Sequence, residues 1–424
     1  MKKLAFFFLV MISTIVHAQD DSSEIFFEEL ANEKLELSGS FDVDYSIFWS
    51  RKESPLYQLL YYNQDLSDIL TSYLLEFYLN GDYQTKDIGV HFKTHLEYFS
   101  DNQIDFYLLE LYGNLNLFDS SFLLLGKKMY NWGKGYAFNP VGYVNSQKDP
   151  ENPELAHAGV VSINFEYSKS FQSNWIQNFA FDLIVLPSKN ILNNMPSEID
   201  NTALAAKLYF LLWDTDVDVM SYYYGNTSTA NIGMDFSRNI IPSVEIHGEL
   251  GFFINQTKNI ISGGALMPQN IDGTSYLFGL RWLNQWNITT ILEYYHNDAG
   301  LTVTEYGDYS TFLSDAVASN ISSTISDALN LSKTYFSGSV LMQDYLYLKI
   351  FWPEPFKLVD FAASAFIIYN INDSSLSVGI PLEYQPITNL KIIFQPTFFI
   401  GNNGTEFGSK QHRGKMEIQA SYYF

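Results

Sequence analysis

The chain has 424 residues, no cysteine and a formal net charge of −23 at pH 7. The lack of cysteine excludes disulfides, thiolate metal sites and thiol catalysis. The acidic balance excludes nucleic acid as a general partner, because phosphate binding needs a basic face. Although 47% of the residues are hydrophobic, no uninterrupted apolar run after the first 18 residues is long enough for a membrane helix.

The first residues have the layout of a secretory signal peptide. Lys2 and Lys3 precede an apolar run from Leu4 to Val16, and Ala18 ends a small-residue cleavage site. The run is shorter than the roughly 20 residues that a membrane-spanning helix needs. We therefore expect residues 1–18 to be removed, leaving 19–34 as an acidic N-terminal lead, either disordered or a short helix.

From residue 35 onward, apolar and polar residues alternate in segments of strand length. In residues 35–49 the odd positions are mainly apolar, and the even positions include Glu36, Asp42 and Asp44. A period of two suits a strand that faces lipid on one side and water on the other. We expect about eighteen strands, and not fewer than sixteen, near 35–49, 69–81, 86–99, 103–116, 120–131, 158–168, 176–187, 202–213, 216–224, 229–238, 242–255, 273–283, 286–297, 335–352, 357–370, 374–385, 388–400 and 412–424.

The connections between these segments alternate in length. The even-numbered connections are all short, whereas the odd-numbered ones include every long one, namely 50–68, 132–157, 188–201, 256–272, 298–334 and 401–411. This asymmetry is typical of barrels with short periplasmic turns and long extracellular loops. An even strand number then places both termini in the periplasm.

The end of the chain carries a family resemblance. Residues 416–424 alternate without a fault and finish on the aromatic Phe424. This resembles Gram-negative outer-membrane β-barrels, in which a terminal aromatic residue is the signal read by the barrel assembly machinery. The resemblance implies an all-β, transmembrane, antiparallel up-and-down barrel over residues 35–424, in contact with outer-membrane lipid and lipopolysaccharide. The 30 Tyr and 34 Phe residues suit aromatic girdles at the two membrane interfaces.

The polar faces of three predicted strands are expected to line the lumen, and together they are acidic. They carry Glu36, Asp42 and Asp44, then His91, Lys93, His95 and Glu97, then Glu245, His247 and Glu249. A barrel of sixteen to eighteen strands leaves an aqueous passage unless a loop or helix blocks it. An acidic wall concentrates cations and repels anions.

The connection 132–157 contains the densest motif of the chain. Glycines at 133, 135 and 142 permit tight bends, and prolines stiffen the following chain. The segment is similar to that of porin-like barrels, including alginate-export relatives, and in general porins the third loop folds inward as the constriction. The resemblance makes Trp132, Lys134, Tyr136, Asn139, Pro140, Lys148, Glu151 and Glu154 constriction candidates. The alternative is a loop that only seals the rim.

Two further hypotheses concern the opening of the pore. Lys134 and Lys148, facing Glu151, Glu154 and the acidic wall, would create a transverse electric field. Residues 313–329 repeat apolar positions at helical spacing, which predicts a helix that enters the lumen as a plug, lies across the mouth or caps the rim.

Metal binding and catalysis are not predicted. His91 and His95 share a strand face, but about 13 Å of rise separates them, too far to share one ion. No Ser, His and acid grouping resembles an outer-membrane hydrolase, and no cofactor motif is present.

The sequence is interpreted as an outer-membrane channel for passive diffusion of small neutral or cationic solutes. With only four arginines (Arg51, Arg238, Arg281 and Arg413), carriage of a polyanion is disfavoured. The alternative is a non-conducting or plugged barrel that serves as a scaffold or sheath for a partner in export or electron transfer. The oligomeric state stays open.

Overall fold

The computed structural model describes residues 34–424 except residues 66, 119, 156, 174, 188–201 and 226. The predicted signal peptide and nearly all of the acidic lead therefore lie outside the described residues. The first strand already includes Lys34, which the prediction had placed in the lead. Among the described residues, no helix has the length and apolar character needed to cross a membrane.

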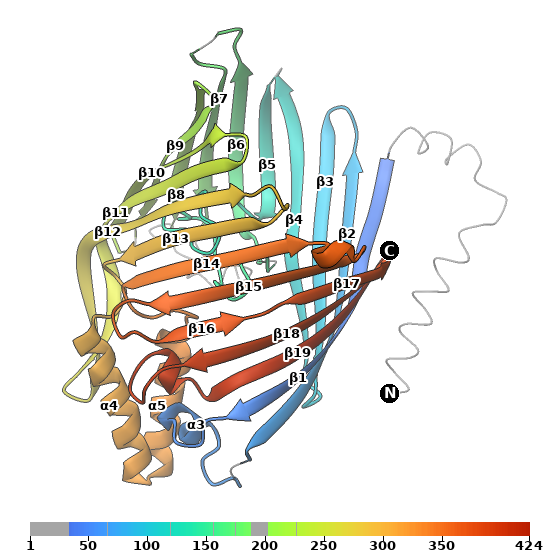
Figure 1. Ribbon diagram of the computed structural model, residues 1–424. Coiled ribbons are helices and arrows are strands. Elements are labelled where there is room, and N and C mark those ends of the chain that lie inside the picture. Colours follow the sequence, from blue (N-terminus) through green and yellow to red (C-terminus); the bar gives the residue numbers. More distant parts are fainter. Residues whose placement is uncertain are drawn as a thin grey trace, which may run out of the picture.

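All strands of the described residues belong to one antiparallel sheet, which closes on itself because β1 pairs with both β2 and β19. The strands are β1 Lys34–Ser50, β2 Ile69–Gln84, β3 Ile88–Phe99, β4 Ile104–Phe118, β5 Ser121–Lys128, β6 Val160–Ser170, β7 Asn178–Leu186, β8 Ala203–Leu212, β9 Thr215–Tyr224, β10 Thr229–Ile241, β11 Val244–Ser262, β12 Ala265–Leu283, β13 Thr289–Asn297, β14 Asp344–Pro353, β15 Phe361–Asn370, β16 Leu376–Gly379, β17 Leu382–Ile387, β18 Leu390–Ile400 and β19 His412–Tyr423. Each strand pairs with its neighbours in the chain, so the barrel is of the up-and-down type (Figure 1).

The barrel has eighteen strand positions, as predicted. β16 and β17 both pair with β15 and with β18, so they are two halves of one strand. The break falls at Pro381, which has no N–H to donate to a neighbouring strand.

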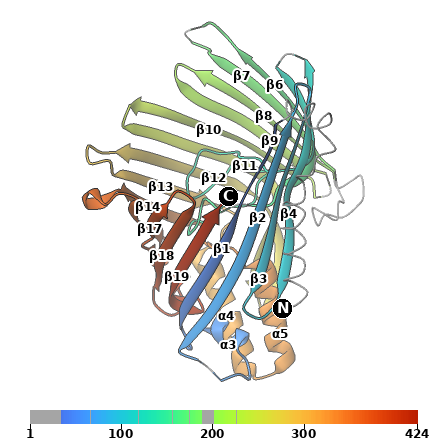
Figure 2. The same ribbon diagram turned by 90° about the vertical axis from the view of Figure 1, so that its right-hand side faces the viewer.

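The last strand closes the barrel beside the first, and Figure 2 shows β1 and β19 side by side. The backbone N–H of Gly39 donates to the carbonyl of Phe424, and the N–H of Phe424 donates to the carbonyl of Gly39, both at 3.1 Å. The C-terminal residue predicted to carry the assembly signal is thus part of the seam. We call the opposite end of the barrel, where the helices lie, the distal end (Figure 1).

The alternation of the sequence becomes an apolar outer face and a polar inner face. On β1, Leu35, Phe41 and Tyr45 are exposed on the outside, whereas Ser40 and Asp42 are buried inside the barrel. The apolar outer face suits contact with lipid and the polar inner face suits contact with water. This alternation favours strands that close into a barrel.

Three helices lie at the distal end: α3 Pro55–Leu60, α4 Val303–Ser319 and α5 Ser322–Tyr335. Two short 3-10 turns, η3 Pro355–Lys357 and η4 Phe407–Ser409, complete the elements. The single predicted helix over 313–329 is wrong. Asn320 adopts a left-handed conformation (φ 52°) that ends α4, and Thr302 with Glu305 forms a capping box that starts α4 earlier than expected.

Two predicted boundaries around strands are also wrong. Residues 256–272 are not a loop, because β11 and β12 continue to a tight turn at Gly263 and Gly264, whose φ angles of 59° and 76° suit glycine. Residues 335–343 are not strand, since α5 ends at Tyr335 and β14 begins only at Asp344. Both errors lie at the distal end, where lipid does not impose alternation on the chain.

Strand packing on the outer face gives a first prediction. Gly81 lies directly opposite Phe92, and a Cβ at Gly81 would come within 2.1 Å of the Phe92 ring. Gly81→Ala should therefore displace that ring and destabilise the barrel by about 1–3 kcal/mol. Gly113→Ala is the matched control, because its Cβ would meet its nearest neighbour only at 3.6 Å. Thermal unfolding in detergent measures both, and equal melting temperatures for the two variants would contradict the packing argument.

Candidate functional site

The connection between β5 and β6, residues 129–159, lies inside the barrel, and we call it the inward loop (Figures 1 and 2). Its apolar side chains Trp132, Phe138 and Val141 are 3%, 3% and 0% exposed. They are covered by side chains of the barrel wall, so the loop occupies part of the lumen and does not merely seal the rim.

Glu249 on β11 holds the first part of the inward loop. Its Oε1 accepts the backbone N–H groups of Lys134 and Gly135, both at 2.6 Å, and its Oε2 accepts that of Val141 at 3.2 Å. The residue is 2% exposed. Buried backbone N–H groups need an acceptor, so the carboxyl group of this one residue fixes two turns of the loop.

Glu293 on β13 holds the next part of the loop. It accepts the backbone N–H of Tyr136 and, at 2.9 Å, that of Ala137. It also pairs, at 3.0 Å, with Nε2 of His247 on β11, reaching across Gly279 of the intervening strand β12. Glu293 is fully buried, and these contacts supply its carboxylate with the partners that a buried charge requires.

Glycine is required where the loop meets Glu249. Gly133 has a φ of 96°, a conformation that side chains disfavour. A Cβ there would stand 2.8 Å from Oε1 of Glu249. The glycine therefore serves both the bend and the close approach of the carboxylate.

Further polar contacts tie the loop to other strands, and the backbone N–H of its first residue, Met129, donates to Glu110 of β4 at 3.1 Å. Lys134 pairs with the buried Asp218 of β9 at 2.8 Å, and Glu151 pairs with Lys415 of β19 at 3.5 Å and contacts Ser377 of β16 at 3.4 Å. The Tyr136 hydroxyl donates to Glu154 at 2.8 Å. Lys349 of β14 donates to the same hydroxyl.

These contacts differ from the predicted transverse field. Lys134 neutralises Asp218, and Lys148 donates to the carbonyl oxygens of Gly135 and Tyr136 within the loop. Neither lysine is paired with Glu151 or Glu154. The lysines are engaged in this way because Asp218, 2% exposed, and the buried carbonyl groups need partners.

The charges of the loop reflect the same burial. Burial lowers the pKa of Lys148, and the carboxylates of Glu249 and Glu293 offset this only in part. Burial also acts against the charge of Lys134, but the hydrogen bond and charge of Asp218 raise its pKa above the usual range. Lys134 therefore stays protonated, and its ion pair persists, throughout the neutral pH range.

An apolar cluster seats the start of the loop against the wall of β7, β8 and β9. Its members are Tyr130, Trp132, Val141, Val144, Ile184, Leu186, Ala203, Ala205 and Met220. Trp132 is the largest loop side chain in this cluster, and it anchors the loop on the side away from β1 to β4.

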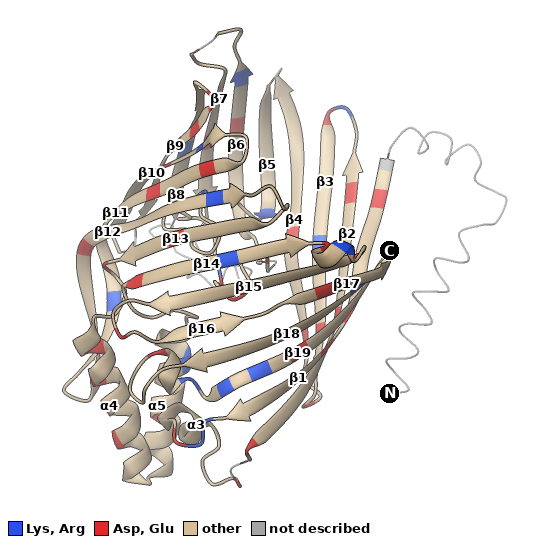
Figure 3. Ribbon diagram, viewed as in Figure 1, with Lys and Arg blue, Asp and Glu red and all other residues tan. Residues whose placement is uncertain are grey.

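Another part of the wall, β1 to β4, carries the polar side chains predicted for the lumen. Glu36, Asp42 and Asp44 follow one face of β1, and His91, Lys93, His95 and Glu97 follow one face of β3. Figure 3 shows acidic positions along β1 and β2. We call this part the acidic wall.

Within the acidic wall, His91 is paired with Asp82 of β2 at 2.6 Å and lies 3.9 Å from Glu110 of β4. On the other side of the lumen, Glu245, His247 and Glu249 share one face of β11, where His247 and Glu249 are buried under the inward loop.

Several residues of the site escaped the sequence analysis, namely Glu76, Asp218, Glu293, Lys349 and Lys415. A signal existed for one of them: Glu293 is the only charged residue of Thr289–Asn297 apart from a histidine. A single carboxylate in such a strand needs a hydrogen-bond donor or a cation as its partner. Here the donors are backbone N–H groups of the loop, which cannot be recognised from residue types.

A chamber of about 570 Å³ lies between the inward loop and the distal segment 337–340. Its lining combines aromatic rings with amides, and it includes Phe138, Asn139, Tyr143, Asn231, Phe253, Gln256, Tyr295 and Asn297. Two lysines, Lys148 and Lys410, and one carboxylate, Asp149, also line it. Rings and neutral hydrogen-bonding groups dominate, a combination that favours neutral polar molecules.

Comparisons with known proteins agree on the fold. No protein-family model and no curated protein matches the sequence. Wzi of Escherichia coli, described as an outer-membrane protein involved in group 1 capsule assembly and a carbohydrate-binding β-barrel, has 12% identity and a TM-score of 0.55, over 96% of this chain and 90% of its own. OccK8 (OprE) of Pseudomonas aeruginosa has 9% identity and a TM-score of 0.54, over 92% and 98%.

OccAB3 of Acinetobacter baumannii has 10% identity and a TM-score of 0.52, over 92% of this chain and 99% of its own. The chain therefore has the fold of porin-like outer-membrane β-barrels. At these identities the likeness concerns the fold alone.

The role of Glu249 gives the second prediction. Glu249→Ala leaves three buried loop N–H groups without an acceptor, each costing about 1–3 kcal/mol, so the loop should leave its docked position. Limited trypsin digestion of the folded barrel should then cut after Lys134 or Lys148, whereas the wild type resists.

The control is Glu245→Ala, on the same face of the same strand. Glu245 accepts a hydrogen bond from Ser237 at 3.0 Å and is not among the carboxylates that hold the loop. Equal resistance of the Glu249→Ala and Glu245→Ala proteins would show that the carboxylate does not hold the loop.

Proposed function

We propose that the protein is an outer-membrane channel for passive diffusion of small neutral or cationic solutes, with both termini in the periplasm and the distal end facing outward. The short turns lie at the end where β1 begins and β19 ends, and the long connections lie at the distal end. That distribution is the one expected for a barrel inserted with periplasmic termini.

The observation that carries the proposal is the asymmetry of the lumen. Most docking contacts of the inward loop lie on β7 to β9, β11, β13, β14, β16 and β19. At the two ends of the loop, the N–H groups of Met129 and Gly159 donate to Glu110 and Leu109 of β4. The acidic wall adjoins these strands at β19 and at β4, but its carboxylates Asp42, Asp44 and Glu97 are not among the groups that hold the loop. A passage between the loop and the acidic wall would concentrate cations, because carboxylates next to low-dielectric walls focus the field.

Neutral polar solutes are supported by the chamber at the distal end. Its rings can stack on the apolar faces of a solute, while the amides hydrogen-bond to its hydroxyl groups. A channel of this kind filters by size at the inward loop and by charge at the acidic wall.

A plugged barrel that binds a ligand is the second candidate, and one observation favours it. A continuous apolar cluster runs from Phe138 of the loop through Tyr295 and Tyr345 to Tyr309 and Leu313 of α4. This cluster fills part of the distal opening. Wzi, a barrel of similar fold, is described as carbohydrate-binding, and its description does not mention transport. It is therefore a precedent for a barrel that binds a ligand. A partner for which the barrel is scaffold or sheath belongs to the same alternative.

Single-channel recording of the refolded protein in a planar bilayer, with reversal potentials under a salt gradient, tests the channel. We expect steady conductance with cation preference. The Asp42→Asn/Asp44→Asn double variant should lower that preference, because it removes two carboxylates from the acidic wall.

The matched control removes two carboxyl groups at the turn between β14 and β15, Glu354→Gln with Asp360→Asn, and should keep the preference. An unchanged reversal potential in the wall variant would contradict the proposed passage. A silent bilayer that contains demonstrably folded barrel would favour the plugged alternative.

A further inference from the structure

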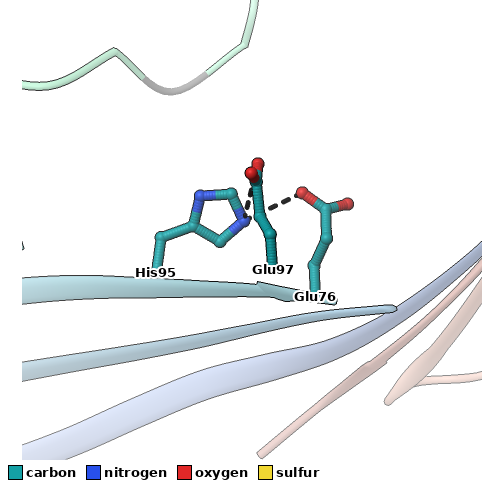
Figure 4. Close-up of side chains that lie close together, drawn as sticks. All are labelled: Glu76, His95 and Glu97. Carbon is teal, nitrogen blue, oxygen red and sulfur yellow. Dashed lines mark hydrogen bonds and ion pairs between the residues drawn. The ribbon is translucent and has the colours of Figure 1, made fainter. Parts of the chain in front are cut away.

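Three lumen side chains of the acidic wall converge on one point. Glu76 of β2, His95 of β3 and Glu97 of β3 each offer one ligand atom, and these atoms lie within 4.8 Å of one another. Figure 4 shows the two carboxylates approaching the same ring nitrogen of His95. The three residues come from two strands. The spacing of His91 and His95 along one strand, which argued against a metal site, could not reveal this arrangement.

The distances suit a small metal ion. Nε2 of His95 is 2.9 Å from Oε1 of Glu76 and 3.6 Å from Oε1 of Glu97. Ligands about 2.0–2.1 Å from a tetrahedral zinc ion stand roughly 3.3 Å apart, and the two observed distances bracket that value. The ligand oxygens of Glu76 and Glu97 lie within 4.8 Å of each other, and side-chain rotation would bring all three donors to coordination distance.

The other histidines with two carboxylate partners are built differently. Asp82 and Glu110 contact opposite ring nitrogens of His91, and the same is true of the carboxylates around His247 and His296. Such carboxylates cannot share one ion with the imidazole. Among these four histidines of the described chain, His95 alone has both carboxylates on one nitrogen.

Surrounding groups hold the three donors in place. The Tyr78 ring stacks on the His95 ring, with centroids 4.0 Å apart and planes inclined by 8°, and its hydroxyl donates to Oε1 of Glu76 at 3.1 Å. On the other side of β3, the ring of Tyr107 of β4 has its centroid 5.9 Å from that of His95. Partners of this kind orient metal ligands and raise the affinity of a site.

The strand register supplies the charge that a cation would neutralise. Asp42 lies directly opposite Glu76, Glu76 opposite Glu97, and Glu97 opposite Asp105. Four carboxyl groups therefore cross four adjacent strands at one level. Like charges in directly opposed positions destabilise a sheet, and a bound cation at the centre of the row removes this repulsion.

We propose that Glu76, His95 and Glu97 bind a divalent transition-metal ion of the zinc type in the lumen. One imidazole and two carboxylates suit zinc and its neighbours, whereas calcium and magnesium prefer oxygen ligands only. The ion adds positive charge to the acidic wall. Its effect on current rests on the proposed function, but its binding needs only the folded barrel.

Cobalt(II) absorption of the folded protein in detergent tests the site directly. Co²⁺ should give visible d–d bands that Zn²⁺ displaces at a ratio of one ion per chain. His95→Gln should weaken binding at least tenfold, as should the nearly isosteric Glu97→Gln, which guards against a folding defect. His91→Gln is the matched control and should bind as the wild type does.

Unchanged Co²⁺ binding in both the His95→Gln and Glu97→Gln proteins, or no binding by the wild type, would overturn the proposal. In the planar bilayer, Zn²⁺ should lower the wild-type current and leave that of the His95→Gln channel unaffected. Co²⁺ binding by a barrel that does not conduct would uphold the metal site and contradict only the channel, so the two failures are distinguishable.

Discussion

Two buried carboxylates, Glu249 and Glu293, determine how the lumen is divided. A loop inside a barrel takes its backbone N–H groups away from water, and each one needs an acceptor. The two glutamates supply acceptors for five such groups, on residues Lys134–Ala137 and Val141. Because both lie on the β11 to β13 side, the loop is drawn to that side of the barrel.

The rest of the charge distribution follows from this anchoring. Two carboxylates beneath the loop are paired within the structure: Asp218 with Lys134, and Glu293 with loop N–H groups and His247. The acidic wall retains carboxylates that face one another across strands, as in the row from Asp42 to Asp105. Similar residues therefore have two roles, set by whether the loop covers them. The anchoring of the loop, the proposed selectivity and the proposed metal site involve different parts of one inner surface.

Much of the fold could be predicted from the sequence, because lipid forces a period of two on every strand that crosses it. The strand starts near 35, 69, 215 and 412 show this. Prediction failed where lipid exerts no constraint: at the extended hairpin around Gly263 and Gly264, and at Asn320 between α4 and α5. For the site, alternation indicated which residues face inward but not which strands face each other. The pairing of Glu76 with His95 depends on the register between two strands. Glu293 binds backbone N–H groups of the loop, which nearly every residue has, so the sequence does not single them out.

The most direct test of this division uses the cysteine-free background of the chain. A single cysteine is introduced either on the acidic wall, Asp44→Cys, or beneath the inward loop, Asp235→Cys, where the native residue is 2% exposed. A charged thiol reagent is then added during single-channel recording. The account predicts a stepwise change in current for Asp44→Cys and none for Asp235→Cys. A response from Asp235→Cys with silence from Asp44→Cys would place the passage on the wrong side of the loop and contradict it.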